Sequence, residues 1–242
     1  MHDSEIAEIA RLLLAARIAG RQVDPPPVAT HEDAYTIQTE IARRDGGFGY
    51  WKLAAPGDGL FFSPIRPAMV GQNGIRFPEG TFVRIGIEGE IVVTLGGAFA
   101  ETALTGGDIT RHVEKVHAGI EIVDTRIAGW PHVPRAPVIA DSMLSGALAI
   151  GDQLERWQEM DLVAPGFSIE VNGQVKAAPQ PNNVGNIFAA LGKMLAHIRS
   201  LDIDLPDRIQ VTTGSATGLI FAEPGDHIAL KSAGRQVAEV RV

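Results

Sequence analysis

The chain has 242 residues, 45% of them hydrophobic, which is enough for one globular domain with a buried core. It has no cysteine, which excludes disulfides, thiolate catalysis and zinc sites built from cysteine. Its formal net charge is −8 without a visible basic patch, which argues against a nucleic-acid partner. The N-terminus lacks a basic leader, and no apolar run could span a membrane, so we expect a cytoplasmic protein.

Two helices are predicted at the start of the chain. Apolar residues recur at helical spacing over residues 4–19. A second helix is predicted from Thr30 to about Arg44, because Thr30 and Asp33 form an acidic variant of a capping box. We expect residues 1–45 to form an N-terminal helical arm.

From Gly46 onward, glycine and proline separate short β-prone segments, and Asn172-Gly173 signals a hairpin turn. Further helices are expected near 108–118 and 183–200. Because strands and helices alternate unequally, the pattern predicts an α+β fold with a largely antiparallel or mixed sheet over residues 46–242. The predicted strands are 82–87, 90–95, 138–139, 147–150, 167–171, 208–213 and 228–230.

The segment RIGIEGEIVVTLG, which runs from Arg84 to Gly96, carries two acids among apolar residues. Side chains two apart on a strand share one face, so Glu88 and Glu90 would lie side by side. Two neighbouring buried carboxylates repel each other unless a cation binds, and Mg²⁺ prefers oxygen ligands. The alternative is a solvated strand edge with two surface glutamates. The pattern alone favours neither.

A second segment, AGIEIVDTR, again places an acid among apolar residues. A buried glutamate needs a partner, so Glu121 could be a third metal ligand or could pair with Arg126. The pattern alone favours the salt bridge. His117 and Glu121 are four apart, a ligand spacing on a helix, but a single pair of this kind is weak support for a metal site.

Three segments together resemble one branch of a known superfamily. In chain order they are Glu88-x-Glu90, the run 121–126 and the run 138–146. They are similar to the 2-keto-4-pentenoate hydratase and 4-oxalocrotonate decarboxylase branch of the fumarylacetoacetase superfamily, over roughly residues 46–242. The resemblance implies a mixed β-roll like the fumarylacetoacetase C-terminal domain, with peripheral helices and assembly into a homo-oligomer.

The resemblance also implies roles for individual residues. One lysine matches a lysine near the family's active site, three glutamates match its metal ligands, and one loop matches the segment that holds the substrate's carboxylate end. The implied site residues are Lys52 as the catalytic residue, Glu88, Glu90 and Glu121 as ligands of Mg²⁺ or Mn²⁺, and Asp141, Ser142 and Ser145 as substrate-binding residues.

The implied activity is that of a divalent-metal-dependent lyase acting on a small oxo acid. Hydration of a short 2-oxo or 2-hydroxy-dienoic acid through a metal-stabilised enolate is the activity expected first. Lys52 is expected to move a proton, because its burial and the charge of the metal would lower its pKa. The alternatives are decarboxylation of a 4-oxalocrotonate or oxaloacetate type of acid, hydrolysis of an acylpyruvate, and a non-catalytic subunit of a partner enzyme in the same pathway. A metal-independent small-molecule binder is a further alternative.

The segment after Lys52 departs from the branch. The loop to Met69 is shorter, and Phe61 or Phe62 falls near the place of an acid that assists proton transfer. Asp58 could substitute for that acid. An apolar lid without a base would disfavour hydration relative to decarboxylation.

Overall fold

The computed structural model describes residues 1–55, 59–104 and 108–242. Its α-helices are α1 (Asp3–Ile18), α2 (His31–Arg44), α3 (Phe99–Leu104), α4 (Arg135–Ala140) and α5 (Ile187–Ser200). Its strands are β1 (Tyr50–Ala54), β2 (Phe61–Pro64), β3 (Val70–Gln72), β4 (Ile85–Gly96), β5 (Val113–Val123), β6 (Ser145–Gln153), β7 (Phe167–Val171), β8 (Gln174–Ala177), β9 (Arg208–Ser215), β10 (Ile220–Ala222), β11 (His227–Ser232) and β12 (Arg235–Arg241).

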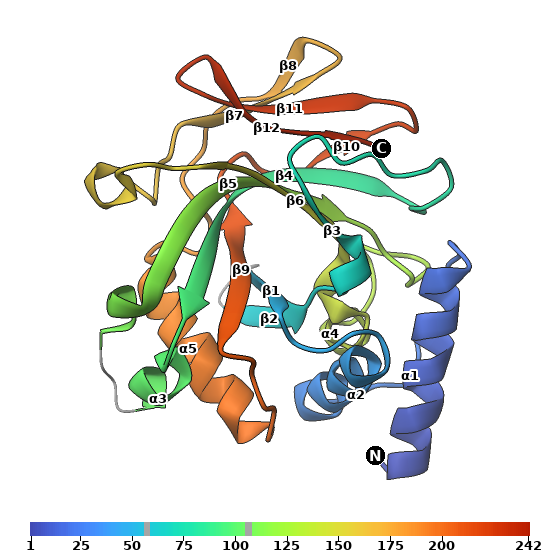
Figure 1. The fold of residues 1–242 in the computed structure, drawn as a ribbon. Helices are drawn as coiled ribbons and strands as arrows, with labels where there is room; N and C mark the ends of the chain where they lie inside the picture. The colour runs from blue at the N-terminus through green and yellow to red at the C-terminus, as the bar shows by residue number, and fades with distance from the viewer. Residues whose placement is uncertain (56–58, 105–107) are drawn as a thin grey trace.

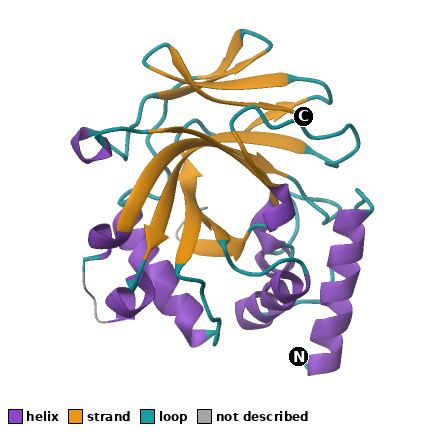
Figure 2. Cartoon of the chain, viewed as in Figure 1, coloured by secondary structure: helices purple, strands orange, loops and turns teal. Residues whose placement is uncertain are grey.

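Two sheets and a set of helices form layers (Figures 1 and 2). A curled sheet has the order β2-β1-β9-β4-β5-β6-β3, with β10 added beside β4, and a smaller sheet has the order β12-β11-β7-β8. The smaller sheet covers the outer face of the curled sheet, and the helices gather on the opposite side. Because β1–β9 and β3–β6 are parallel and the other pairs antiparallel, the predicted mixed α+β fold is confirmed.

The long central strand β4 is buried on both faces. Its odd-numbered residues, among them Ile87 and Ile91, point toward the smaller sheet, where Gly89 lies against Leu230. Its even-numbered residues therefore point into the hollow of the curled sheet. This alternation places Glu88 and Glu90 on the concave face.

The first two helices follow their sequence signals closely. The Thr30 hydroxyl accepts a hydrogen bond from the Asp33 amide at the start of α2, as the capping pattern predicts. Ile9 and Ile37 from these helices belong to the same hydrophobic core as the curled sheet. A unit boundary at residue 45 stays a prediction. In the described part of the chain, no helix is long and apolar enough to cross a membrane.

Two predicted elements are wrong. The expected helix at 108–118 is a short 3₁₀ helix, Ile109–His112, followed by β5, because pairing with β4 and β6 on both sides determines this segment. His117 and Glu121 therefore lie on a strand and not on one helical face. The expected strand at 138–139 lies inside helix α4.

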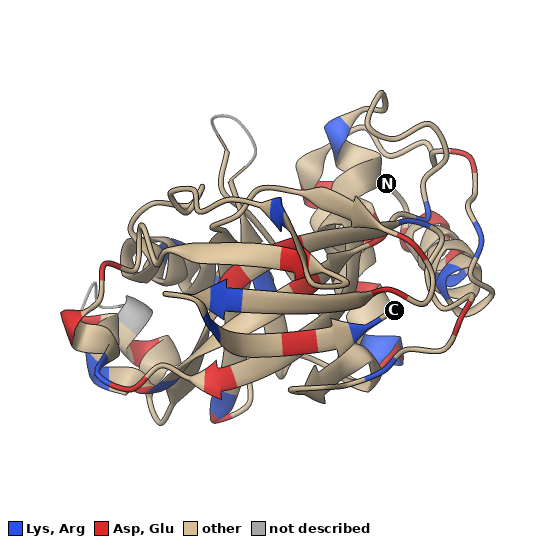
Figure 3. Cartoon of the chain, turned by 90° about the horizontal axis from the view of Figure 1, so that it is seen from above, with Lys and Arg blue, Asp and Glu red and all other residues tan. Residues whose placement is uncertain are grey.

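Other turns and surfaces behave as expected. Asn172 and Gly173 both have positive φ, which suits the tight turn between β7 and β8. On the outer sheet, acidic and basic residues are interspersed (Figure 3). The side chains of Lys231 and Glu170 form an ion pair there at 3.4 Å. Such pairs between partly exposed side chains contribute little to stability.

Candidate active site

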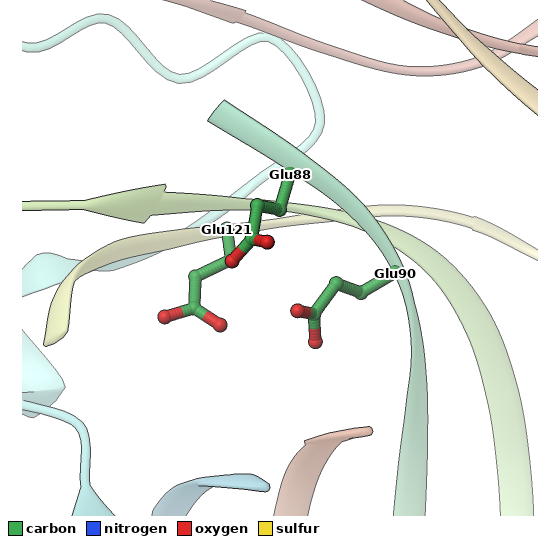
Figure 4. A group of neighbouring side chains, drawn as sticks. All are labelled: Glu88, Glu90 and Glu121. Carbon is green, nitrogen blue, oxygen red and sulfur yellow. The ribbon is translucent and has the colours of Figure 1, made fainter. Parts of the chain in front are cut away.

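Three carboxylates meet on the concave face of the curled sheet (Figure 4). Glu88 and Glu90 are two residues apart on β4, and the register places Glu121 of β5 directly opposite Glu88. One carboxylate oxygen from each residue lies within 4.8 Å of the other two. Glu90 and Glu121 are each 1% exposed, so this is an interior cluster and not a solvated strand edge.

The cluster carries more negative charge than its surroundings neutralise. Burial and repulsion from Glu121 raise the pKa of Glu88 to about 7. Burial, followed by repulsion from Glu121 and Glu88, raises the pKa of Glu90 well above its ordinary value. Within the described residues, Glu121 Oε2 is buried without a hydrogen-bond partner. A hard divalent cation with oxygen ligands fits these three residues.

Metal binding is expected to strengthen as the pH rises. The pKa of Glu88 is 4.5 ordinarily and about 7 here, so below pH 7 a cation has to displace a proton. Apparent Mg²⁺ affinity should therefore rise at least about tenfold per pH unit up to neutrality and then level off. By the same linkage, the metal-free protein should lose stability as the pH rises through 7. Calorimetric Mg²⁺ titrations from pH 5.5 to 8 measure this, and a flat affinity profile would contradict it.

The C-terminal end of β9 holds two of the glutamates. Glu90 Oε2 accepts hydrogen bonds from the Thr212 hydroxyl and from the Gly214 amide, the latter at 2.9 Å, and Ser215 hydrogen-bonds Glu88. Gly214 has a φ of +89°, and a Cβ there would lie 2.5 Å from Asn183 Oδ1. The sequence-based prediction gave Thr212, Gly214 and Ser215 no role. Hydroxyl residues and a glycine together at the end of a strand could have indicated groups that hold a ligand carboxylate.

Thr212→Val should weaken metal binding about 10- to 100-fold, because the residue that orients a ligand carboxylate is lost. Thr213→Val is the matched control, since the Thr213 hydroxyl donates to the Ile91 carbonyl and not to a glutamate. Both variants lose one buried hydroxyl from the same strand. Equal Mg²⁺ affinities of the two variants in calorimetry would show that Thr212 does not orient Glu90.

Lys52 joins the cluster from β1. It is 4% exposed and Nζ hydrogen-bonds Glu121 Oε1, so it does not snorkel from an aromatic surface. Its register partners are Ser63 on β2 and Thr212 on β9. Burial lowers the pKa of Lys52, but attraction to Glu121 and Glu88 outweighs burial and raises it. The expected lowering of the Lys52 pKa by burial together with the metal's charge stays a prediction.

Asp141 binds arginine. Arg126 donates from its amide to Asp141 Oδ2 at 2.9 Å and from Nε to Oδ1 at 2.8 Å, and it also pairs with Asp124. Arg17 Nη2 lies 3.6 Å from Asp141 Oδ1. The alternative pairing of Arg126 with Glu121 is therefore wrong, because Lys52 takes that place.

The segment after Asp141 has an unusual backbone. Ser142, Met143 and Leu144 have φ values of 54°, 50° and 63°, a region costly for residues other than glycine. The Ser63 hydroxyl donates to the Ser142 carbonyl at 2.7 Å, and Ser145 is buried at the start of β6. This segment thus adjoins β2 beside Lys52. No hydrogen bond between the described residues joins it directly to the three glutamates.

The predicted apolar lid is partly wrong. Phe62 is 2% exposed and stacks on Tyr35 with ring centroids 4.8 Å apart, so it belongs to the core. Strand alternation turns it away from Lys52, whose partner on β2 is Ser63. Phe61 is partly buried against the same core. Asp58 lies outside the described residues.

The chain is similar to proteins of known activity. No family model matches the sequence. The chain is 27% identical over 233 residues to 4-oxalocrotonate decarboxylase of Pseudomonas putida, covering 86% of this chain and 84% of that protein. It is 28% identical over 208 residues to 2-keto-4-pentenoate hydratase 1 of Dechloromonas aromatica (strain RCB), covering 77% and 74%.

A solved structure agrees over the whole chain. The 4-oxalocrotonate decarboxylase of Pseudomonas putida G7, complexed with magnesium and adipate, superposes with a TM-score of 0.85 and covers 100% of this chain and 98% of that one, at 18% identity. The chain is thus similar to the hydratase and decarboxylase branch of the fumarylacetoacetase superfamily in sequence, and it shares the fold of the decarboxylase. The glutamate cluster with Lys52 is the candidate active site on its geometry.

Proposed function

We propose that the chain is a divalent-metal-dependent lyase of the hydratase type, acting on a short 2-oxo or 2-hydroxy-dienoic acid. The observation that carries this proposal is that Glu88 and the buried Glu90 and Glu121 converge beside Lys52 on one concave face. Relatives of the chain are named hydratases and a decarboxylase of such acids, which supports the substrate class.

We propose Glu88, Glu90 and Glu121 as the ligands of Mg²⁺ or Mn²⁺. The decarboxylase structures similar to this chain are complexed with magnesium or calcium, which supports a hard cation. When bound, such a cation acts as a Lewis acid that polarises a carbonyl oxygen. Thr212, Ser215 and the Gly214 amide would keep two of the ligand carboxylates in place.

Lys52 is the proposed proton carrier. Its ammonium group is buried, and its nearest charged neighbour is Glu121. Because the glutamates raise its pKa, any loss of negative charge at Glu121 would lower that pKa toward the range in which Nζ exchanges protons. A carbon next to the polarised carbonyl is the atom that would gain or lose this proton.

We propose that the segment with Asp141, Ser142 and Ser145 helps to bind the substrate carboxylate. Asp141 would act indirectly, since its oxygens bind Arg126 and Arg17. Ser142 and Ser145 flank the backbone that Ser63 holds near β2. The whole chain is proposed to work as a cytoplasmic homo-oligomer, with residues 1–45 as a helical arm and 46–242 as the catalytic unit.

Decarboxylation is the second candidate. Hydration needs a base that activates water, whereas decarboxylation needs only an electron sink and a proton donor. Among the described residues, β2 places the hydroxyl of Ser63, and not a carboxylate, opposite Lys52. This observation favours release of CO₂ from a 4-oxalocrotonate type of acid.

An activity panel tests the proposal. Purified protein with Mg²⁺ should be assayed against 2-hydroxypentadienoate, 4-oxalocrotonate, oxaloacetate and an acylpyruvate, following water addition and CO₂ release separately. We expect hydration of the dienoate that disappears after metal removal and returns with Mg²⁺. CO₂ release without hydration would select the second candidate. Inactivity on every acid would point to a non-catalytic partner subunit.

A further inference from the structure

A second cavity lies away from the glutamates, between the C-terminal end of α1, the segment after β2 and the loop before β4. Its volume is about 320 Å³. Its charged lining residues are Arg17, Arg66, Arg126 and Asp124, and none of the candidate active-site glutamates lines it. Three guanidinium groups therefore line this cavity, and Asp45, Asp124 and Asp141 pair with them.

Some hydrogen-bond donors of Arg17 have no acceptor among the described residues. Its side chain is only 8% exposed, and its protein partner in the described chain is Asp141, which it reaches through Nη2. Nε and Nη1 of Arg17 thus have no protein acceptor among the described residues. Burial and repulsion from Arg126 lower the pKa of Arg17 to about 9. A bound anion would reduce the repulsion between the buried guanidinium groups of Arg17 and Arg126.

The two other arginines differ in what they can offer. Arg126 uses its amide, Nε and both Nη atoms on Asp141 and Asp124, so it contributes charge rather than free donors. Arg66 pairs with Asp45 through Nε and Nη2, which leaves Nη1 without an acceptor in the described structure. Arg17 and Arg66 are therefore the groups with open donors in this cavity.

We propose that this cavity binds a small oxyanion, a carboxylate or a phosphate, through Arg17 and Arg66. Guanidinium groups bind both anions with paired, charge-assisted hydrogen bonds, which is the chemistry that the two sources share. A volume of about 320 Å³ suits a compact molecule such as a short dicarboxylate or a phosphate ester. Neither Lys52 nor the three glutamates line this cavity, although Arg17 contacts Asp141 behind it.

Calorimetry on metal-depleted protein tests the proposal, because without a cation the glutamate cluster repels anions. Succinate and inorganic phosphate should be titrated at constant ionic strength set with chloride. We expect one site with a dissociation constant of about 1 mM or tighter for at least one of them. Arg17→Met and Arg66→Met should each weaken binding at least about tenfold. The preferred anion identifies the source.

Arg208→Met is the matched control, since Arg208 is an exposed arginine that pairs with Glu114 outside the cavity. It should leave anion affinity unchanged. If the buried Arg17 variant does not fold, Arg66→Met carries the test, because its side chain is 18% exposed. Absence of binding up to about 10 mM, no effect of Arg66→Met, or an equal effect of Arg208→Met would overturn the proposal.

Discussion

Glu90→Gln should lower turnover by about 10³-fold or more and weaken Mg²⁺ binding severely, because a ligand charge is removed and the Lewis acid is worth several kcal/mol. The substitution keeps the side chain's size, and its amide oxygen can still accept from Thr212 and Gly214. The fold should therefore survive. In the metal-free state the variant should even be more stable than the wild type at pH values at which Glu90 is ionised, since a buried repelling carboxylate is gone. Turnover, metal affinity and thermal melting measure these effects.

Glu170→Gln is the control for this prediction. Glu170 lies on the smaller sheet and pairs with Lys231 at 3.4 Å, away from the glutamate cluster. It should keep the turnover and metal affinity of the wild type. Full activity of Glu90→Gln would remove Glu90 from the metal site and would leave the remaining two carboxylates too few for the proposed coordination.

Lys52→Met should lower turnover by about 10²-fold or more without weakening metal binding. Methionine fills a similar volume but carries no proton. Because Lys52 pairs with Glu121, its removal frees that carboxylate, so Mg²⁺ affinity should stay the same or increase. This combination separates loss of proton transfer from loss of the metal site. Single-turnover rates at saturating Mg²⁺, together with calorimetry, measure both quantities.

Lys231→Met serves as the matched lysine control, since Lys231 lies on the smaller sheet and pairs with Glu170. Near-normal turnover of Lys52→Met would assign Lys52 a purely structural role in neutralising Glu121. A fall in Mg²⁺ affinity parallel to the fall in turnover would likewise argue against proton transfer.

Local spacing predicted part of the site. Glu88 and Glu90 share a face because they are two apart on one strand, and the sequence shows that directly. Glu121 joins them only through the β4–β5 register, which sequence periodicity does not reveal. Its partner Lys52 arrives from β1, on the far side of β9. The three-segment resemblance supplied what periodicity could not.

The errors have the same physical origin. The segment 108–118 contains helix-compatible residues, yet pairing of β5 with two neighbours outweighs local propensity. The sequence suggests Glu121, five residues away, as the partner of Arg126. In the fold, Asp141 comes from a later segment and its Oδ1 lies 2.8 Å from Arg126 Nε. Phe62 was assigned to a lid because no sequence signal places it against Tyr35. Long-range packing decided each of these cases.

The most direct test of the metal centre is a crystal structure with Mn²⁺, located by its anomalous scattering. We predict one strong peak between Glu88, Glu90 and Glu121, with an oxygen from each at about 2.0–2.4 Å from the ion. A fully loaded ion bound elsewhere, with these three carboxylates left unligated, would contradict it.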